Sequence, residues 1–403
     1  MTTFRTRFSG ASTGRPPQWG RPTSSWAFLG VAVASFGGPL ALAALYAPGI
    51  VTDATSSAGL AMLAAVAVFI FPLVIWLSYA RQINTSGGLY SFTEAAAGRR
   101  IALVQAGLWI VSYLLYLIYT VVQIVYDTLP VIFPGVKSYQ PFLEIAIPVA
   151  IAAVMIAGRA AFMVVIGLIA AGQLAIAAAL GGLTVANLDT PVSTFGTSAP
   201  AGSIAIATGQ TALLYICGSL PLFLGGELAS PARTMRRGLI ATFAVTAAVM
   251  TLAVAPLAAA PFFTKSEIPG MTVAQAYAGH GFAVAVGVGV CVSVAGVILV
   301  EYFALSRLIP TVTGWPVRPV IIGLGVALVA FAPITLINPD RIYDDLLKPS
   351  LIALWVSQLI VFAVYPRFAA KQHSRMLPAW TLTIAACAFA IYGLWTTIQH
   401  SAT

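Results

Sequence analysis

The sequence predicts an all-α integral membrane protein with about eleven transmembrane helices, arranged as two inverted repeats of five helices and one extra C-terminal helix. Three observations predict this class. Hydrophobic residues make up 60% of the 403 residues and charged residues only 8%, whereas soluble domains have roughly 25% charged residues. The apolar residues gather in windows of about 20, the length that crosses a bilayer. The basic residues fall mostly on one side of the membrane that these windows define.

The apolar windows divide the chain into four parts. Residues 1–25 form a basic tail, residues 26–185 the first repeat, residues 204–365 the second repeat, and residues 377–398 the extra span. The spans of the first repeat are expected at 26–46, 60–79, 101–129, 142–157 and 160–185. Those of the second are expected at 204–229, 238–260, 282–306, 317–336 and 348–365.

The positive-inside rule supports this order of spans. With the N-terminus in the cytoplasm, sixteen of the twenty Lys and Arg residues lie on the inner side, and only Lys137, Lys265, Arg341 and Lys348 lie outside. With an odd number of spans, the C-terminus is then expected on the extracytoplasmic side of the membrane. Because topology accounts for the net charge of +9, we expect lipid and no nucleic acid as partners.

Few residues could support cofactor or metal chemistry. The three cysteines all lie within apolar windows, the three histidines lie in predicted loops or the tail, and neither set has a metal-ligand spacing. No phosphate-binding glycine loop of the ATPase type is present. We therefore expect no cofactor and no metal, and energy from a gradient or from exchange.

Two glycine- and proline-containing interruptions lie at matching places in the repeats. The first span contains Ser35, Phe36, Gly37, Gly38 and Pro39 at its centre, and the sixth contains the run 217–221, Cys-Gly-Ser-Leu-Pro. In inverted-repeat transporters such interruptions mark helices that are broken at the substrate site. Either one alone could be an ordinary kink, but the matching pair favours a binding site.

Several motifs carry a family resemblance. Gly87, Gly88 and Tyr90, followed by Gly98 and Arg99, form a Gly-Gly-x-Tyr and Gly-Arg pattern in the first inner loop. Further along, the run 227–233 reads Glu-x-x-Ser-Pro-x-Arg, the run 306–308 reads Ser-Arg-Leu, and a short external helix is expected at 269–281. In this order and spacing, the motifs resemble those of the amino acid, polyamine and organocation (APC) transporter superfamily. Ser230 stands where that family usually has Asn.

The resemblance implies the fold of the bacterial leucine transporter and a substrate held between spans one and six. The free N–H groups of a broken helix, near Gly37 and Gly38, could accept a carboxylate. The free carbonyls near Tyr215 could accept an ammonium. The remaining predicted substrate-binding residues at the two breaks are Ser35, Phe36, Cys217, Gly218 and Ser219. No charged side chain lies at either break, so a neutral amino acid or small amine is the expected substrate.

Span three is expected to line the same pocket, because the family implies it. Tyr113 and Tyr116 lie near its centre on one helical stripe. The alternative is that these tyrosines only pack against neighbouring helices.

Three ionisable residues are candidates for coupling or gating, because charges within membrane spans are expensive. Glu301, in span eight, could carry a proton or form an ion pair with a nearby arginine. Arg159, at the start of span five, could act in coupling, although an ordinary positive-inside anchor is the favoured interpretation. Glu227 is expected to brace an inner gate by pairing with Arg233 or Arg81.

The expected function is secondary active transport of an amino acid or related small amine by alternating access, coupled to protons or to exchange. The alternatives are a different organic solute, such as a nucleobase or a carboxylate, a channel, or an intramembrane enzyme. An intramembrane enzyme would need paired carboxylates or histidines at one depth, and the spans offer Glu301 alone. We therefore expect no enzymatic activity.

Overall fold

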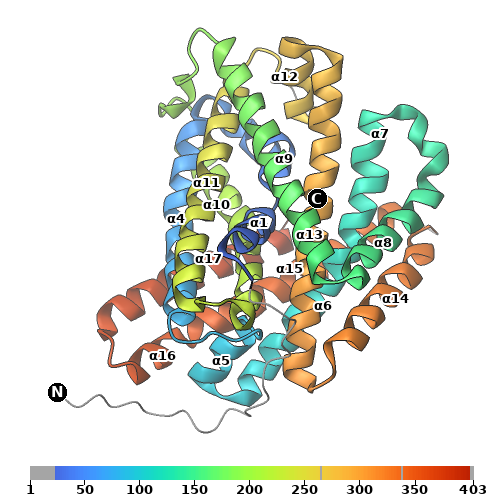
Figure 1. Ribbon diagram of the computed structural model, residues 1–403. Helices are drawn as coiled ribbons and strands as arrows, with labels where there is room; N and C mark the ends of the chain where they lie inside the picture. The colour runs from blue at the N-terminus through green and yellow to red at the C-terminus, as the bar shows by residue number, and fades with distance from the viewer. Residues whose placement is uncertain (1–22, 264–265, 337–338, 400–403) are drawn as a thin grey trace.

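The computed structural model describes residues 23–263, 266–336 and 339–399, and every regular element in them is a helix. The predicted tail, residues 1–25, lies mostly outside this part of the chain. A single backbone bridge joins Thr23 to Leu228. The all-helical class is therefore confirmed for the described residues (Figure 1).

The first repeat begins with a segmented helix. It comprises α1 (Ser25–Ser35), α2 (Pro39–Ala41), the π-helix η1 (Leu42–Tyr46), α3 (Ala47–Ile50) and the 3₁₀-helix η2 (Val51–Ser57), and it is followed by α4 (Ala58–Ala80). The whole stretch has 56 residues, and a straight helix of that length would be about 84 Å long at 1.5 Å per residue. A hydrocarbon core is only about 30 Å thick, so the stretch must reverse direction, in keeping with predicted spans one and two.

The rest of the first repeat consists of long helices with short connections. Its elements are α5 (Leu89–Ala97), α6 (Arg99–Val122), the π-helix η3 (Gln123–Thr128), α7 (Leu129–Ile132), the 3₁₀-helix η4 (Pro134–Tyr139), α8 (Gln140–Ala157) and α9 (Arg159–Ala186). Glycines with positive φ, Gly98 and Gly158, separate α5 from α6 and α8 from α9. Glycine adopts this conformation without steric cost, so these two connections can be a single residue long.

The second repeat follows the 3₁₀-helix η5 (Ser193–Phe195). It contains α10 (Ala201–Leu213), the 3₁₀-helix η6 (Leu214–Glu227), α11 (Pro231–Ala259), α12 (Pro269–Ala278), α13 (His280–Thr313), α14 (Val317–Thr335) and α15 (Pro339–Ala363). The chain ends with α16 (Tyr365–Lys371) and α17 (Met376–Gln399). Helix α12 occupies the position expected for the short external helix.

Nine helical stretches of the described residues are long and apolar enough to cross a membrane, which supports a multi-pass membrane protein. One of the nine is the 56-residue stretch that holds α1 and α4, and the apolar part of α14, Val317–Ala332, is shorter than these stretches. The number of eleven spans and the positions of the two termini stay predictions.

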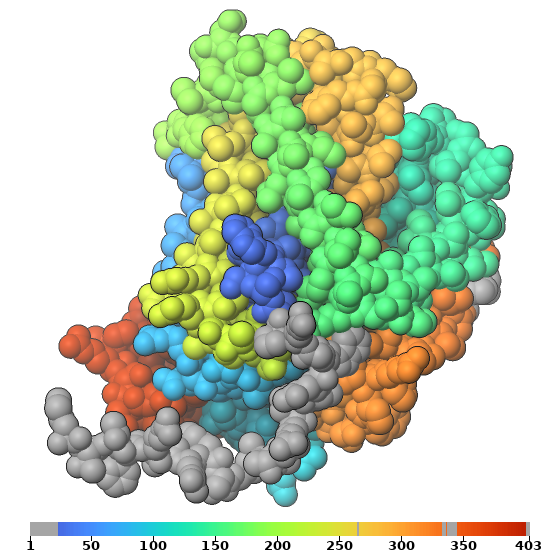
Figure 2. Space-filling view, in the orientation of Figure 1, coloured from blue at the N-terminus to red at the C-terminus, as the bar shows by residue number. Residues whose placement is uncertain are grey.

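Helix α13 lies at the centre of the bundle, where it packs against α9, α6, α12 and α1 (Figure 1). Most of its residues are apolar and buried, as expected of a helix surrounded by others. By contrast, α9 exposes Val164 and Leu168 on its outer face. The start of α1 reaches the surface between α9 and α11 (Figure 2). Thus α1 runs from the edge of the bundle to its centre, where it breaks.

The two ends of the bundle carry different short helices. Helix α12 lies at one end, whereas α5 and α16 lie together at the other (Figure 1). Lys371 fastens α16 to α5, because its Nζ donates to the carbonyls of Ala95 at 2.8 Å and Ala96 at 3.1 Å. Tyr79 stacks on Phe92 of α5 with ring centroids 4.9 Å apart. These contacts hold α5, which lies in the predicted inner loop, against α16 and the end of α4.

Candidate functional site

The first span is broken where the sequence predicts. Helix α1 ends at Ser35, and Gly37 and Gly38 have φ values of +75° and +69° before Pro39 starts α2. Residues with a side chain rarely adopt this region, so the two glycines permit the break. The proline then begins the next helix at a position where its missing N–H is not needed.

The sixth span differs from its prediction. Helix α10 ends at Leu213, and the 14 residues from Leu214 to Glu227 form a 3₁₀-helix that contains Pro221. We expected an unwound break at 217–221 with carbonyls open to an ammonium. Instead the backbone winds more tightly, with bonds of the i to i+3 type. Because 3₁₀-helices longer than three or four residues are uncommon, the segment is still unusual and marks a hinge or strain.

A cavity of about 800 Å³ lies beside the break in span one. Four of the predicted residues line it: Gly37, Tyr113, Tyr116 and Cys217. Its wall also includes polar residues that sequence reasoning missed, among them Tyr46, Ser112, Thr120, Gln210, Lys348 and Thr396. The cavity therefore combines residues from α6, η6 and the outer part of span one with residues from α10, α13, α15 and α17.

The other predicted substrate residues lie outside the cavity lining. Phe36 and Tyr215 belong to a buried aromatic cluster with Phe69 and Phe243, in which ring centroids are 5.3 to 6.5 Å apart. Gly218 lies directly against the Phe36 ring. The cluster packs the two central spans against α4 and α11, so here the structure shows the packing role for both rings.

Ser35 and Ser219 form internal hydrogen bonds. Ser35 Oγ donates to the carbonyl of Ala32 at 2.7 Å. Ser219 Oγ accepts from Gln358 Nε2 of α15 at 3.4 Å. Both serines are fully buried. The Ser35 bond lies within the last turn of α1, whereas the Ser219 bond links η6 to α15.

Gly38 contacts a polar pair on the neighbouring helices. Ser293 Oγ of α13 donates to Gln173 Oε1 of α9, and it accepts from the backbone N–H of Ala41 at 3.4 Å. A Cβ atom at Gly38 would overlap Ser293 Oγ. The break is thereby held against the two helices that support it, and only glycine fits at that point.

Glu301 is completely buried on α13, and neither of its carboxylate oxygens has a hydrogen-bond partner among the described residues. It lies within electrostatic range of the Tyr113 hydroxyl and the Cys217 thiol, both of which line the cavity. Arg307, which lies on the same helix about two turns further along, pairs with a different carboxylate, Glu227. A buried carboxylate without a partner is expensive to ionise, so this site favours the neutral acid.

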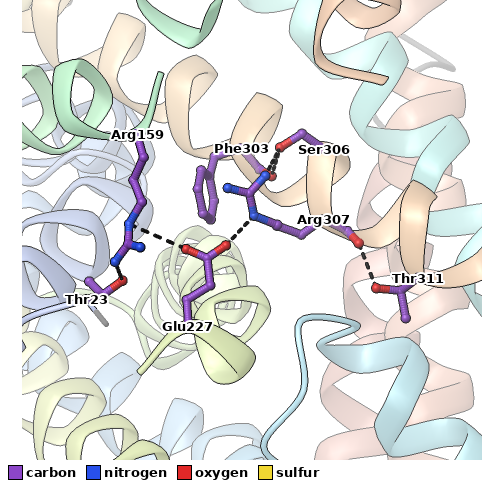
Figure 3. A network of polar contacts seen from close by, with 7 residues as sticks. All are labelled: Thr23, Arg159, Glu227, Phe303, Ser306, Arg307 and Thr311. Carbon is purple, nitrogen blue, oxygen red and sulfur yellow. Dashed lines mark hydrogen bonds and ion pairs between the residues drawn. The ribbon is translucent and has the colours of Figure 1, made fainter. Parts of the chain in front are cut away.

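Glu227, Arg159 and Arg307 form a network at the end of the bundle that carries α5 (Figure 3). Arg307 Nε lies 2.5 Å from Glu227 Oε1, and Arg159 Nε lies 3.7 Å from Glu227 Oε2. Arg159 also donates to Thr23, whose backbone N–H donates to the carbonyl of Glu227 at 2.8 Å. The network thus joins the start of span one to η6, α9 and α13.

We expected Glu227 to pair with Arg233 or Arg81. That prediction is wrong, because α13 and α9 bring Arg307 and Arg159 to Glu227 instead. Arg159 does more than anchor α9 at the membrane surface. Arg307 is nearly fully buried, lies over the Phe303 ring at 4.2 Å and donates to Ser306 at 3.0 Å. A buried arginine inside a long apolar helix is a signal that could have identified it from sequence.

A hydrogen bond joins the outer parts of spans one and three. Tyr46 Oη donates to Gln123 Oε1 at 2.7 Å. Tyr46 ends the π-helix η1, and Gln123 begins the π-helix η3. Such π-helical segments occur frequently at functional sites, and Tyr46 lines the cavity.

No protein-family model matches this chain, and no curated protein matches it. Among solved structures, the chain is similar to a Na⁺-coupled sialic acid symporter in a substrate-bound outward-open state, at a TM-score of 0.59 and 13% identity, covering 94% of this chain and 90% of that one. It is also similar to MhsT in complex with L-phenylalanine, at a TM-score of 0.61 and 14% identity, covering 92% of this chain and 98% of that one. The chain has the leucine-transporter fold. This is the fold that APC-type transporters share, so the resemblance of the motifs and the arrangement of the helices agree.

Proposed function

We propose that this protein is a secondary active transporter that moves an amino acid or a related small amine across the cell membrane by alternating access. The observation that carries the proposal is the cavity of about 800 Å³ at the break of span one, with Gly37, Tyr113 and Cys217 in its wall. The free N–H groups at the start of α2 suit a carboxylate, because a helix N-terminus carries partial positive charge. The Na⁺-coupled sialic acid symporter with the same fold supports this class of function, and MhsT, also of this fold, binds the amino acid L-phenylalanine.

The polar network around Glu227 supports alternating access. It links Thr23, ahead of span one, to α9 and α13 at the end of the bundle opposite α12. The predicted topology makes this end cytoplasmic. We infer that the network closes the inner side of the pathway while the cavity faces outward, and that its ion pairs break when the transporter turns inward.

Glu301 is proposed as the proton carrier. Its carboxyl is buried close to two cavity residues and has no hydrogen-bond partner in the described part of the chain. The neutral acid suits the closed site, whereas contact with water in another state would allow the proton to leave. The competing hypothesis of a structural ion pair loses support, because Arg307 is engaged by Glu227.

The test is uptake by the purified protein in proteoliposomes, with radiolabelled amino acids and an inward proton gradient. We expect saturable accumulation that collapses with a protonophore. Glu301→Gln should abolish accumulation but spare counterflow exchange, and Glu301→Asp should retain part of both. Accumulation by Glu301→Gln at the wild-type level would contradict the proton-carrying role. The absence of saturable uptake and counterflow for all amino acids and amines would contradict the transporter proposal for this substrate class.

Sodium coupling is the second candidate, because the sialic acid symporter with this fold is Na⁺-coupled. The same vesicles with choline replacing sodium on both sides separate the two ions. Proton coupling through Glu301 predicts that uptake persists in choline. Uptake that requires sodium and ignores the proton gradient would assign the coupling to sodium instead.

A further inference from the structure

One side of the cavity, which we call the arm, is formed by residues of α10, α15 and the extra C-terminal helix α17. Gln210 of α10, Trp355 of α15, and Thr396 and Thr397 of α17 line the same cavity as Gly37 at the central break. Helix α13 packs in the middle of the bundle, whereas α17 packs against α15, α4 and α10. The cavity thus extends from the central helices to a peripheral one.

The walls of this arm are largely apolar. Leu213, Leu351 and Leu354 line it together with Trp355. The hydroxyls of Thr396 and Thr397 donate to the carbonyl of Gly393 in their own helix, at 3.0 and 2.8 Å. Because each hydroxyl already donates a hydrogen bond within its own helix, both side chains can face an apolar group without leaving a donor unsatisfied.

The cavity wall carries charge at one place. Among the described residues that line it, only Asp345 and Lys348 are charged, and both lie in the first half of α15, three residues apart. The apolar part of the α15 wall begins one turn later, at Leu351, and continues to Trp355.

Packing holds the wall of the arm in place. A Cβ atom at Gly393 would meet the Trp355 indole at 2.5 Å, so the two helices touch closely there. Trp355 also contacts the Phe389 ring edge to face, with centroids 5.7 Å apart. Because the indole is confined from two sides, the arm is preformed, which lowers the ordering cost of binding.

We propose that this arm is a subsite for an uncharged, large apolar or aromatic side chain of the substrate, so that the transporter prefers large neutral amino acids or the corresponding amines to small ones. The inference rests on the proposed function and names the substrate class for the same cavity. The α-amino and carboxyl groups would lie near the break in span one, and the side chain would extend toward Trp355. Affinity then rises with the apolar surface that the arm covers.

Binding of L-phenylalanine, L-leucine, L-alanine and glycine to the purified full-length protein tests the subsite, with calorimetry or a scintillation proximity assay as the readout. The wild type should bind L-phenylalanine at least ~10-fold more tightly than L-alanine, a ratio that a hydrophobic pocket can supply. In Thr397→Phe, which fills the arm, the affinity for L-phenylalanine and L-leucine should fall ~10-fold or more, while L-alanine is unaffected.

Ile398→Phe is the matched control, because Ile398 is half exposed on the same turn of α17 and does not line the cavity. It should leave all four affinities unchanged. Thr397→Val should also bind normally, since it keeps the shape of the arm. Two outcomes would overturn the subsite and leave the transporter proposal standing. One is tight binding of L-alanine by the wild type with no preference for L-phenylalanine. The other is an equal loss of affinity for all four ligands in Thr397→Phe. No binding of any amino acid or amine by folded wild type would overturn the proposed function itself, and the subsite with it.

Discussion

Arg307 Nε of α13 lies 2.5 Å from Glu227 Oε1 at the end of η6, and both side chains are almost completely buried. The pair joins α13, at the centre of the bundle, to η6, the part of span six that is wound as a 3₁₀-helix. Removing one partner of a buried ion pair leaves an uncompensated charge, which is strongly destabilising. Each side chain of the pair therefore depends on the other for its stability in the buried site.

Glu227→Gln should destabilise the closed state by about 3 to 5 kcal/mol, the range for breaking a buried pair. The measurements are thermal unfolding and alkylation of the native Cys217 in a background where Cys291 and Cys387 are replaced by Ala. We expect a lower Tm and faster alkylation from the α5 end. Arg159→Gln is the control, because its 3.7 Å contact is longer and Arg159 is more exposed, so its effect should be nearer 1 kcal/mol. A larger loss of stability in Arg159→Gln than in Glu227→Gln would contradict this ranking of the two ion pairs.

Gly38→Ala should weaken both folding and ligand binding. Its φ of +69° disfavours a side chain, and the new Cβ would overlap Ser293 Oγ. A backbone strain of this kind costs about 1 to 3 kcal/mol. Gly49→Ala is the matched control, since nothing lies within 4 Å of a Cβ there. The double variant Gly38→Ala, Ser293→Ala should recover part of the loss. A Tm equal to the wild type in Gly38→Ala would refute the requirement for glycine.

The Tyr46 and Gln123 pair should couple the outer parts of spans one and three. A double-mutant cycle with Tyr46→Phe and Gln123→Leu, read as free energy of unfolding, should give a coupling of about 0.5 to 1.5 kcal/mol, the usual net value of a hydrogen bond. Strictly additive effects would show that the 2.7 Å contact does not stabilise the observed state.

Trp109→Ala should destabilise the protein through a cavity beneath the substrate site. The Trp109 ring packs at a tilt against Tyr113 and Phe223, with centroids 4.0 and 4.6 Å apart, and it is fully buried. Loss of a buried tryptophan costs about 3 to 5 kcal/mol. Trp380→Ala, at an exposed position of α17, serves as the control and should change Tm little. Equal shifts for both variants would contradict a packed floor below Tyr113.

Much of the fold could be predicted from periodicity and composition, because a bilayer imposes strong local rules on the chain. Each span must satisfy its backbone within one helix, so apolar length alone located α6, α9, α11 and α17. The break at Gly37 and Gly38 was also visible, since a glycine pair before proline cannot continue a helix. By contrast, the sequence could not show that span six continues as a 3₁₀-helix, because Gly218 in that segment packs against the Phe36 ring of span one, which lies far away along the chain.

The site divides in the same way. The residue types within single spans determined that Gly37, Tyr113, Tyr116 and Cys217 were candidates, because their helices and depths follow from position along the chain. Which of the candidates face the cavity, and which pack behind it as Tyr215 does, was decided only by how the helices rotate against each other.

The partners of charged groups also come from the tertiary structure. Sequence proximity suggested Arg233 for Glu227, yet α13 and α9, far along the chain, supply Arg307 and Arg159. Likewise, no pattern in residues 377–398 indicates that Thr396 and Thr397 line the cavity. Local sequence determines which segments become helices and where they break. Packing between distant helices decides which side chains meet, because each contact depends on the positions of two helices that the sequence describes separately.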